Sequence, residues 1–271
     1  MVNLIARAWR SRLNLFRTVF LRLVLYLARS YGFWQVCLDD QEAAYREVGL
    51  SRSDGLAKLS SVDTVFEGSY DETRGMFSEH LILLSSIAAR EHSFERILEI
   101  GTYDGVTAAL LSHLFPNVLI DTVDLDSSEA EFIDTYGRNA AVSRFDEDRA
   151  KTLSISKNIN FFQCNSISIA NWTKKYDLIW IDGAHGYPVV AMDVINAFRL
   201  CKEGGYVLID DIWKSVGISD KFYKSIGGFE SLKELQSARL IADFHLIPKR
   251  LGGEYNIKWE KKFVGIFKRP E

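Results

Sequence analysis

Residues 176–213 read YDLIWIDGAHGYPVVAMDVINAFRLCKEGGYVLIDDIW, and two hydrophobic strands in this stretch each end in acidic residues. The first strand closes on Asp182, and the second closes on the pair Asp210 and Asp211. A helix-length segment and a glycine pair lie between the strands. In an open parallel sheet, ligands bind at the carboxyl ends of the strands. The stretch therefore predicts an α/β fold in which three carboxylates are directed at one site.

These three carboxylates also predict a metal site. Three oxygen ligands, with water filling the other positions, suit Mg²⁺, so we expect Asp182, Asp210 and Asp211 to be metal ligands. His185 follows the first of them by three residues and is the candidate base. Consecutive strand residues point to opposite faces. The paired acids can therefore converge only where the strand has become irregular.

A second informative stretch, residues 96–126, reads RILEIGTYDGVTAALLSHLFPNVLIDTVDLD. It predicts a buried strand over residues 97–100, a tight glycine turn, a helix over 106–114 and a strand that ends at Asp124. This order is typical of the nucleotide-binding half of a doubly wound fold, with the acid suited to ribose hydroxyls. The turn lacks the G-x-G-x-x-G pattern of dinucleotide sites. A cofactor with adenosine but no phosphates fits better, and S-adenosylmethionine is the obvious one.

The motifs EIGTYDG, the acid at position 124, YDLIWIDGAH and GGYVLIDD together resemble class I S-adenosylmethionine-dependent methyltransferases. Within that group the chain is similar to the metal-dependent O-methyltransferases of the catechol and caffeoyl-CoA type. It departs from them in having an Asp-Asp pair in place of Asp-Asn, and His185 where the catechol enzymes place a lysine. Both departures resemble the macrolide-sugar O-methyltransferases.

The resemblance covers residues 78–213 and implies a doubly wound, seven-stranded, mostly parallel sheet whose last strand is antiparallel. Residues 240–247 and 263–267 are expected to be the closing pair of strands. It also implies the residues that contact the cofactor. Glu99 would fix the cofactor's amino group, Asp124 would bind the ribose, and Asn165 and Ser166 would hold the adenine edge. The full expected cofactor set is Glu99, Gly101, Thr102, Gly105, Asp124, Asn165, Ser166 and Asp182. Asp126 is the alternative ribose ligand, and a solvated turn would explain positions 165 and 166 nearly as well.

These roles define an expected mechanism. The cation would lower the pKa of an acceptor hydroxyl, His185 would accept the proton, and the oxygen would attack the sulfonium methyl group in line. A chelating metal favours a vicinal diol, on a small molecule or a glycosyl group, as the acceptor. Two alternatives remain: a metal-independent methyltransferase acting on oxygen or nitrogen, and a cofactor-binding scaffold without catalysis.

Composition bounds the partners and the compartment. The 271 residues carry a formal net charge of −3, which gives no reason to expect nucleic acid as a partner. The three cysteines are far apart and form no metal or redox motif, so we expect a reducing compartment and a cytoplasmic protein. Cys164 and Cys201, which lie in segments expected to be a strand and a helix, are expected to be buried thiols.

We expect three segments: an N-terminal helical extension over residues 1–50, a connecting or lid region over 51–77, and the methyltransferase domain over 78–271. Residues 1–38 contain six arginines and no acid, with apolar residues at helical spacing. Three roles stay open for this extension: packing in a homo-oligomer or over the active site, lying on an anionic membrane surface, and organelle targeting.

Overall fold

The computed structural model describes residues 33–62, 79–130, 132–133, 142–215, 225–249 and 262–271. Most of the arginine-rich extension lies outside the described residues, as do positions 63–77 of the expected connecting region. Among the described residues, no helix has the length and apolar character needed to cross a bilayer.

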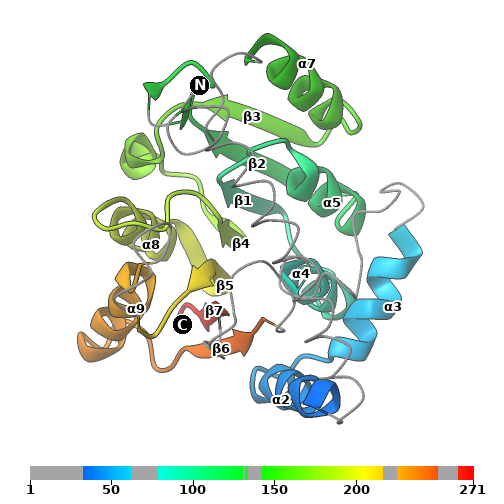
Figure 1. Ribbon diagram of the computed structural model, residues 1–271, viewed down its shortest axis with the longest axis vertical. Helices are drawn as coiled ribbons and strands as arrows, with labels where there is room; N and C mark the ends of the chain where they lie inside the picture. The colour runs from blue at the N-terminus through cyan, green and yellow to red at the C-terminus, as the bar shows by residue number, and fades with distance from the viewer. Residues whose placement is uncertain (1–32, 63–78, 131, 134–141, 216–224, 250–261) are drawn as a thin grey trace, which may run out of the picture.

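Seven strands form one sheet, in the order β3-β2-β1-β4-β5-β7-β6 (Figure 1). The contacts among β3, β2, β1, β4 and β5 are parallel, whereas β7 runs antiparallel to both β5 and β6. The predicted doubly wound, mostly parallel sheet with an antiparallel last strand is confirmed. The strands are β1 (Arg96–Ile100), β2 (Leu119–Asp124), β3 (Ile159–Gln163), β4 (Tyr176–Ile181), β5 (Cys201–Ile212), β6 (His245–Pro248) and β7 (Phe263–Lys268).

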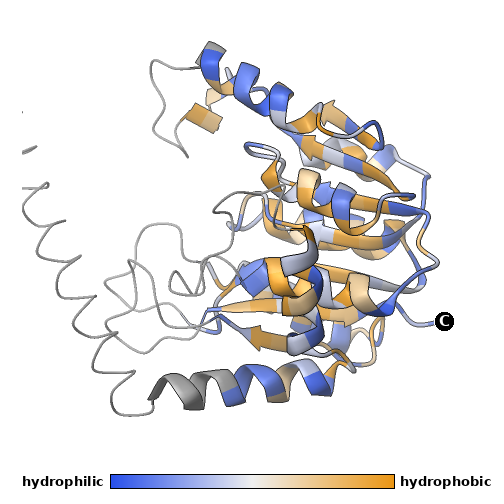
Figure 2. Cartoon of the chain, turned by 90° about the vertical axis from the view of Figure 1, so that its right-hand side faces the viewer, coloured by the Kyte–Doolittle hydropathy of each residue, from blue (hydrophilic) through white to orange (hydrophobic). Residues whose placement is uncertain are grey.

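Helices cover both faces of the sheet, with α4 and α5 on one face and α8 and α9 on the other (Figure 1). The strands are mainly hydrophobic, whereas α2 and α7 carry long polar stretches (Figure 2). The helices are α2 (Phe33–Glu47), α3 (Arg52–Val62), α4 (Glu79–Arg90), α5 (Val106–Leu114), α7 (Val142–Leu153), α8 (Val189–Leu200) and α9 (Gly227–Ser237), with a short 3₁₀ helix η3 (Ser166–Asn171).

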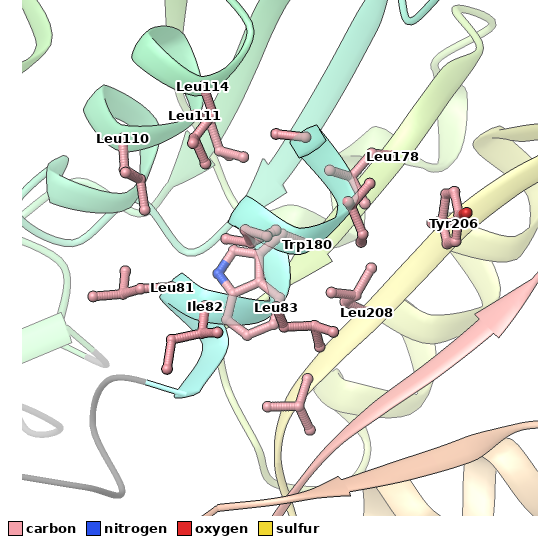
Figure 3. Packing of buried hydrophobic residues seen from close by; sticks show 14 of the residues in the cluster. Leu81, Ile82, Leu83, Leu110, Leu111, Leu114, Leu178, Trp180, Tyr206 and Leu208 are labelled. Carbon is pink, nitrogen blue, oxygen red and sulfur yellow. The ribbon is translucent and has the colours of Figure 1, made fainter. Parts of the chain in front are cut away.

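The central strand β4 has both faces buried, as its nearly unbroken apolar sequence predicts for a parallel strand. On one face the indole ring of Trp180 is packed among leucine and isoleucine side chains of α4 and α5 (Figure 3). His80 of α4 is stacked on the same ring, with 5.4 Å between the ring centroids. Burial lowers the pKa of His80 to about 4, so this histidine is neutral at pH 7. Trp180 and Ile181 are both buried, so the hydrophobic core extends to the residue directly before Asp182.

Two expected boundaries were wrong. The run 240–247 was expected to be a strand, but β6 begins only at His245. The amide nitrogens of Leu240 and Ile241 instead donate to the carbonyl oxygen of Leu235, so these residues close the end of α9. Cys201, expected within the helix, is the first residue of β5, and Gly204 and Gly205, whose sequence predicts a turn, lie inside that strand. Cys201 is buried as expected, whereas Cys164 is only half-buried.

A buried ion pair fastens the N-terminal helices to the domain. Arg52 at the start of α3 donates to the Glu79 carboxylate at 2.9 Å, and the Tyr45 hydroxyl of α2 donates to the same carboxylate at 3.0 Å. All three side chains are buried. Residues 52–62, at the start of the expected connecting region, thus form a helix packed on α4 and α5.

Candidate active site

The strand order brings the carboxyl ends of β2, β1, β4 and β5 side by side. Two backbone hydrogen bonds continue the ladder beyond β1: the Gly101 amide donates to the Val123 carbonyl, and the Asp182 amide donates to the Ile100 carbonyl, each at 2.8 Å. The predicted acids therefore end at one edge of the sheet, as the two sequence stretches indicated.

The glycine turn after β1 is packed directly against the backbone that follows β4. Gly101 has a φ of +102°, and a Cβ atom there would lie 2.3 Å from the carbonyl oxygen of Asp182. Neither the angle nor the distance is compatible with a side chain. Gly105, with a φ of +82°, begins α5, and the Asp104 carboxylate accepts from the Val106 amide. This close approach leaves a backbone-lined surface at the edge of the sheet.

Asp124 ties this turn to the end of β2. Its carboxylate accepts hydrogen bonds from the amides of Tyr103 at 2.6 Å and Leu125 at 2.8 Å. Burial raises the pKa of Asp124, and these two hydrogen bonds oppose the rise. Asp126, the alternative ribose ligand, is half-buried, and its carboxylate accepts hydrogen bonds from the amide and hydroxyl of Ser128 in its own turn. Asp124 is thus the acid built into the turn.

Glu99 has one carboxylate oxygen that no described residue binds. Its Oε2 accepts from the Thr122 hydroxyl at 2.5 Å, and that hydroxyl lies 2.6 Å from the hydroxyl of Thr102. The Oε1 atom is buried without a hydrogen-bond partner, and burial raises the pKa of the group to about 8. A buried acceptor left open beside a backbone-lined turn fits the ammonium group of an amino-acid ligand. These residues therefore fit S-adenosylmethionine.

The residues after β3 have local partners. The Asn165 side chain caps η3 by accepting from the Ile167 amide at 2.9 Å. Asp193 of α8 is a fully buried carboxyl group whose pKa burial raises to about 6, and neither of its oxygens has a hydrogen-bond partner among the described residues. Sequence reasoning missed Asp193, because a single acid at a helical spacing gives no sign that it faces inward.

The paired acids converge through an irregularity inside β5. The register between β5 and β7 shifts between Ile209 and Ile212, and Asp211 has a φ of +55°. As a result Asp210 and Asp211 both contact one cation, the ammonium of Lys249, which lies 2.9 Å from the second acid. Convergence was predicted to need a break in the strand, and a bulge supplies it.

His185 lies beside these acids. Its Nε2 atom is 3.7 Å from Oδ1 of Asp182 and 3.7 Å from Oδ2 of Asp211. Burial lowers the pKa of His185, whereas Asp211 and Asp210 raise it. Burial and the two neighbouring acids also raise the pKa of Asp182. The expected base and the three expected ligands therefore form one cluster.

The cluster does not fit a divalent cation. In the described part of the chain, no group of three His, Cys, Asp or Glu residues is arranged to hold a metal ion. The oxygens that would bind Mg²⁺ instead contact ammonium groups: Lys249 contacts Asp210 and Asp211, and Lys262 contacts Asp211. The structure thus gives no support to the predicted metal site.

Sequence reasoning missed both lysines. They flank the pair β6 and β7, in which Pro248 is opposite Phe263. The Lys249 amide donates to the carbonyl oxygen of Lys262 at 2.7 Å. Two lysines directly outside two strands were visible in the sequence, but only the register of that pair places them together.

Comparisons with known proteins bear on the class of fold. Residues 98–212 match a protein-family model described as a methyltransferase domain. No curated protein matches the chain. Many solved structures do.

Three of these solved structures illustrate the likeness. The cofactor-bound Rv0187 from MTB is 16% identical over 80% of this chain and 90% of that chain, with a TM-score of 0.50. The O-methyltransferase TomG from Streptomyces achromogenes, solved in complex with SAM, is 17% identical over 85% and 96%, with a TM-score of 0.49. An O-methyltransferase from Bacillus cereus in complex with SAH is 15% identical over 79% and 90%, with a TM-score of 0.47. At these identities the likeness is one of fold.

The fold, the glycine turn and the matched segment define the class. The chain resembles the class I S-adenosylmethionine-dependent methyltransferases in its strand order, and residues 98–212 match a family model described as a methyltransferase domain.

Proposed function

We propose that this protein transfers the methyl group of S-adenosylmethionine to a hydroxyl oxygen of a small molecule or a glycosyl group. The observation that carries the proposal is the position of His185. Its Nε2 atom lies between Asp182, which follows β4, and Asp211 near the end of β5, and the cofactor-fitting turn after β1 packs against the backbone of Asp182. A base and a cofactor cradle thus share one edge of the sheet.

Each residue has a task in this proposal. The open oxygen of Glu99 binds the ammonium of the methionine part, and Asp124 fixes the turn and faces the ribose. When bound, the cofactor supplies a sulfonium methyl group, which is a strong electrophile. His185, neutral at pH 7 because burial lowers its pKa, accepts the proton of the acceptor hydroxyl. Holding base and methyl donor at adjacent strand ends supplies the orientation that transfer needs.

The vicinal diol stays a prediction from the sequence, as does a cytoplasmic location. The diol was inferred from chelation by Mg²⁺, and removal of a proton by His185 needs only one hydroxyl. A panel of acceptors therefore includes isolated alcohols and phenols beside catechols and sugars.

Cofactor binding is tested by calorimetric titration with S-adenosylmethionine. We expect the wild-type protein to bind and Asp124→Ala to bind about 10-fold or more weakly, because charge-assisted hydrogen bonds that shape the turn are lost. Asp126→Ala is the matched control and keeps wild-type affinity. Absence of binding by the folded wild-type protein would overturn the proposal.

The chemical step is tested with His185→Asn and the acceptor panel, with product detected by mass spectrometry. Loss of a general base lowers kcat by about 100-fold or more, whereas cofactor affinity should stay unchanged. His245→Asn, a partly exposed histidine 3.7 Å from Glu47, is the control. Tight cofactor binding with no turnover on any acceptor would favour the scaffold alternative.

A further inference from the structure

The acid cluster contains more negative charge than an isolated buried site tolerates. Asp182, Asp210 and Asp211 lie together, and each has a side chain that is at most 30% exposed. Carboxylates this close raise one another's pKa unless a cation is present. In many carboxylate clusters a divalent metal supplies that charge.

Here two lysines supply it. The side chain of Lys249 is 3% exposed, and its ammonium contacts Oδ1 of both Asp210 and Asp211. The ammonium of Lys262, whose side chain is 14% exposed, contacts Oδ2 of Asp211. Three acids and two ammonium groups leave one net negative charge at the cluster, beside a neutral histidine.

The carboxylate oxygens that contact the lysine ammonium groups cannot also coordinate a divalent cation. Mg²⁺ requires near-octahedral oxygen ligands at about 2.0–2.1 Å, and both oxygens of Asp211 already face ammonium groups. A divalent ion would also lie next to two buried or half-buried positive charges, which strongly opposes its binding.

Lys249 is held in place by the backbone on both sides. Its own amide donates to the carbonyl of Lys262, and the preceding carbonyl, of Pro248, accepts from the buried Gln41 side chain of α2 at 2.7 Å. A side chain on such a supported edge has a fixed position. The Lys249 ammonium is therefore a fixed component of the cluster.

We infer that Lys249, assisted by Lys262, occupies the position that a divalent cation would take, and that methyl transfer by this protein requires no divalent metal. The inference rests on the proposed function for the reaction itself. Lys249 is a positioning residue, since its burial keeps it from an acceptor. It holds Asp210 and Asp211, and through Asp211 it fixes the surroundings of His185. Activation of the acceptor then falls to His185.

A titration with Mn²⁺, in which electron paramagnetic resonance measures the free ion, tests directly whether Lys249 occupies the position of a divalent cation. We expect the wild-type protein to bind Mn²⁺ no tighter than about 1 mM, which is the range of weak oxygen-ligand sites. Lys249→Met should gain Mn²⁺ affinity by about 10-fold or more, because three carboxylates are left short of positive charge. Lys249→Arg, which keeps the charge, should not gain it. Lys233→Met removes a half-exposed lysine and is the matched control.

Each outcome decides between the alternatives. Tight Mn²⁺ binding by the wild-type protein that Asp210→Asn abolishes would overturn the inference, and so would a folded Lys249→Met that still ignores Mn²⁺. If Lys249→Met does not fold, the wild-type titration decides alone. Methyl transfer by the wild-type protein should persist in excess EDTA, and its loss there would also overturn the inference. Failure of the proposed function is seen separately, as absent binding of S-adenosylmethionine.

Discussion

At the scale of single residues, Glu99 is a carboxyl group at the proposed site whose pKa burial raises far above its usual value. Its carboxyl is fully buried, with one oxygen bound by Thr122 and the other open. Burial raises its pKa from 4.5 to about 8. The unliganded protein therefore carries a proton on Glu99 at pH 7, whereas the unfolded chain does not.

This difference predicts how stability depends on pH. The folded state binds more protons than the unfolded state between pH 4.5 and about 8, so the contribution of Glu99 to stability is present at low pH and is lost as the pH rises through that window. Glu99→Gln removes the dependence, because its amide does not ionise. Urea unfolding at pH 5, 6.5 and 8 should show the variant gaining stability relative to the wild-type protein as the pH increases. A constant difference between the two proteins would contradict the raised pKa.

At the scale of elements, the β1–α5 turn is the most constrained connection near the site. It is shaped by the close approach of Gly101 to the backbone after β4, and it is fastened by Asp124 at the end of β2. The backbone of this turn is therefore held from two neighbouring strands at once.

Gly101→Ala should therefore damage both stability and cofactor binding. The new methyl group would meet a carbonyl oxygen 2.3 Å away, at a φ of +102° that alanine strongly disfavours. We expect a loss of about 3 kcal/mol in the free energy of unfolding. Gly186→Ala is the control, because nothing lies within 4 Å of its added Cβ. Denaturant unfolding of both variants checks the expectation, and equal stabilities would show that the turn can yield.

At the scale of the whole molecule, two hydrophobic cores enclose the sheet from opposite faces. One core joins α4 and α5 to the central strands, and the other joins α8 and α9 to them. Strands β1 and β4 are buried along nearly their whole length, whereas each residue of the edge strand β3 is either half-buried or exposed. The edge of the sheet that carries the proposed site therefore adjoins the most deeply buried strands.

Native-state hydrogen exchange should reproduce this gradient. Amides of β1 and β4 are expected to exchange only through global unfolding, and those of β3 and β6 through smaller openings that cost less free energy. Mass spectrometry of peptides covering 96–100, 176–181 and 159–163 gives the comparison. Exchange from β3 as slow as that from β4 would show that the sheet opens only as a unit.

The sequence by itself determined the class of fold and much of the site. The local patterns were apolar runs that end in an acid, a glycine turn and helical spacing. Parallel strands present their carboxyl ends at one edge of a sheet. This rule predicts that Glu99, Asp124, Asp182, His185 and the paired acids lie near one another. The helix Val106–Leu114 and the end of β2 at Asp124 were predicted as observed.

Only the tertiary structure decided the charge balance of that cluster. Lys249 reaches Asp210 and Asp211 because β6 and β7 pair in one register and α2 supports the end of β6. The bulge in β5 then turns both acids toward the same ammonium. Contacts between residues 38 positions apart depend on packing of the whole chain, so no local pattern could show that lysine, rather than a metal, meets these carboxylates.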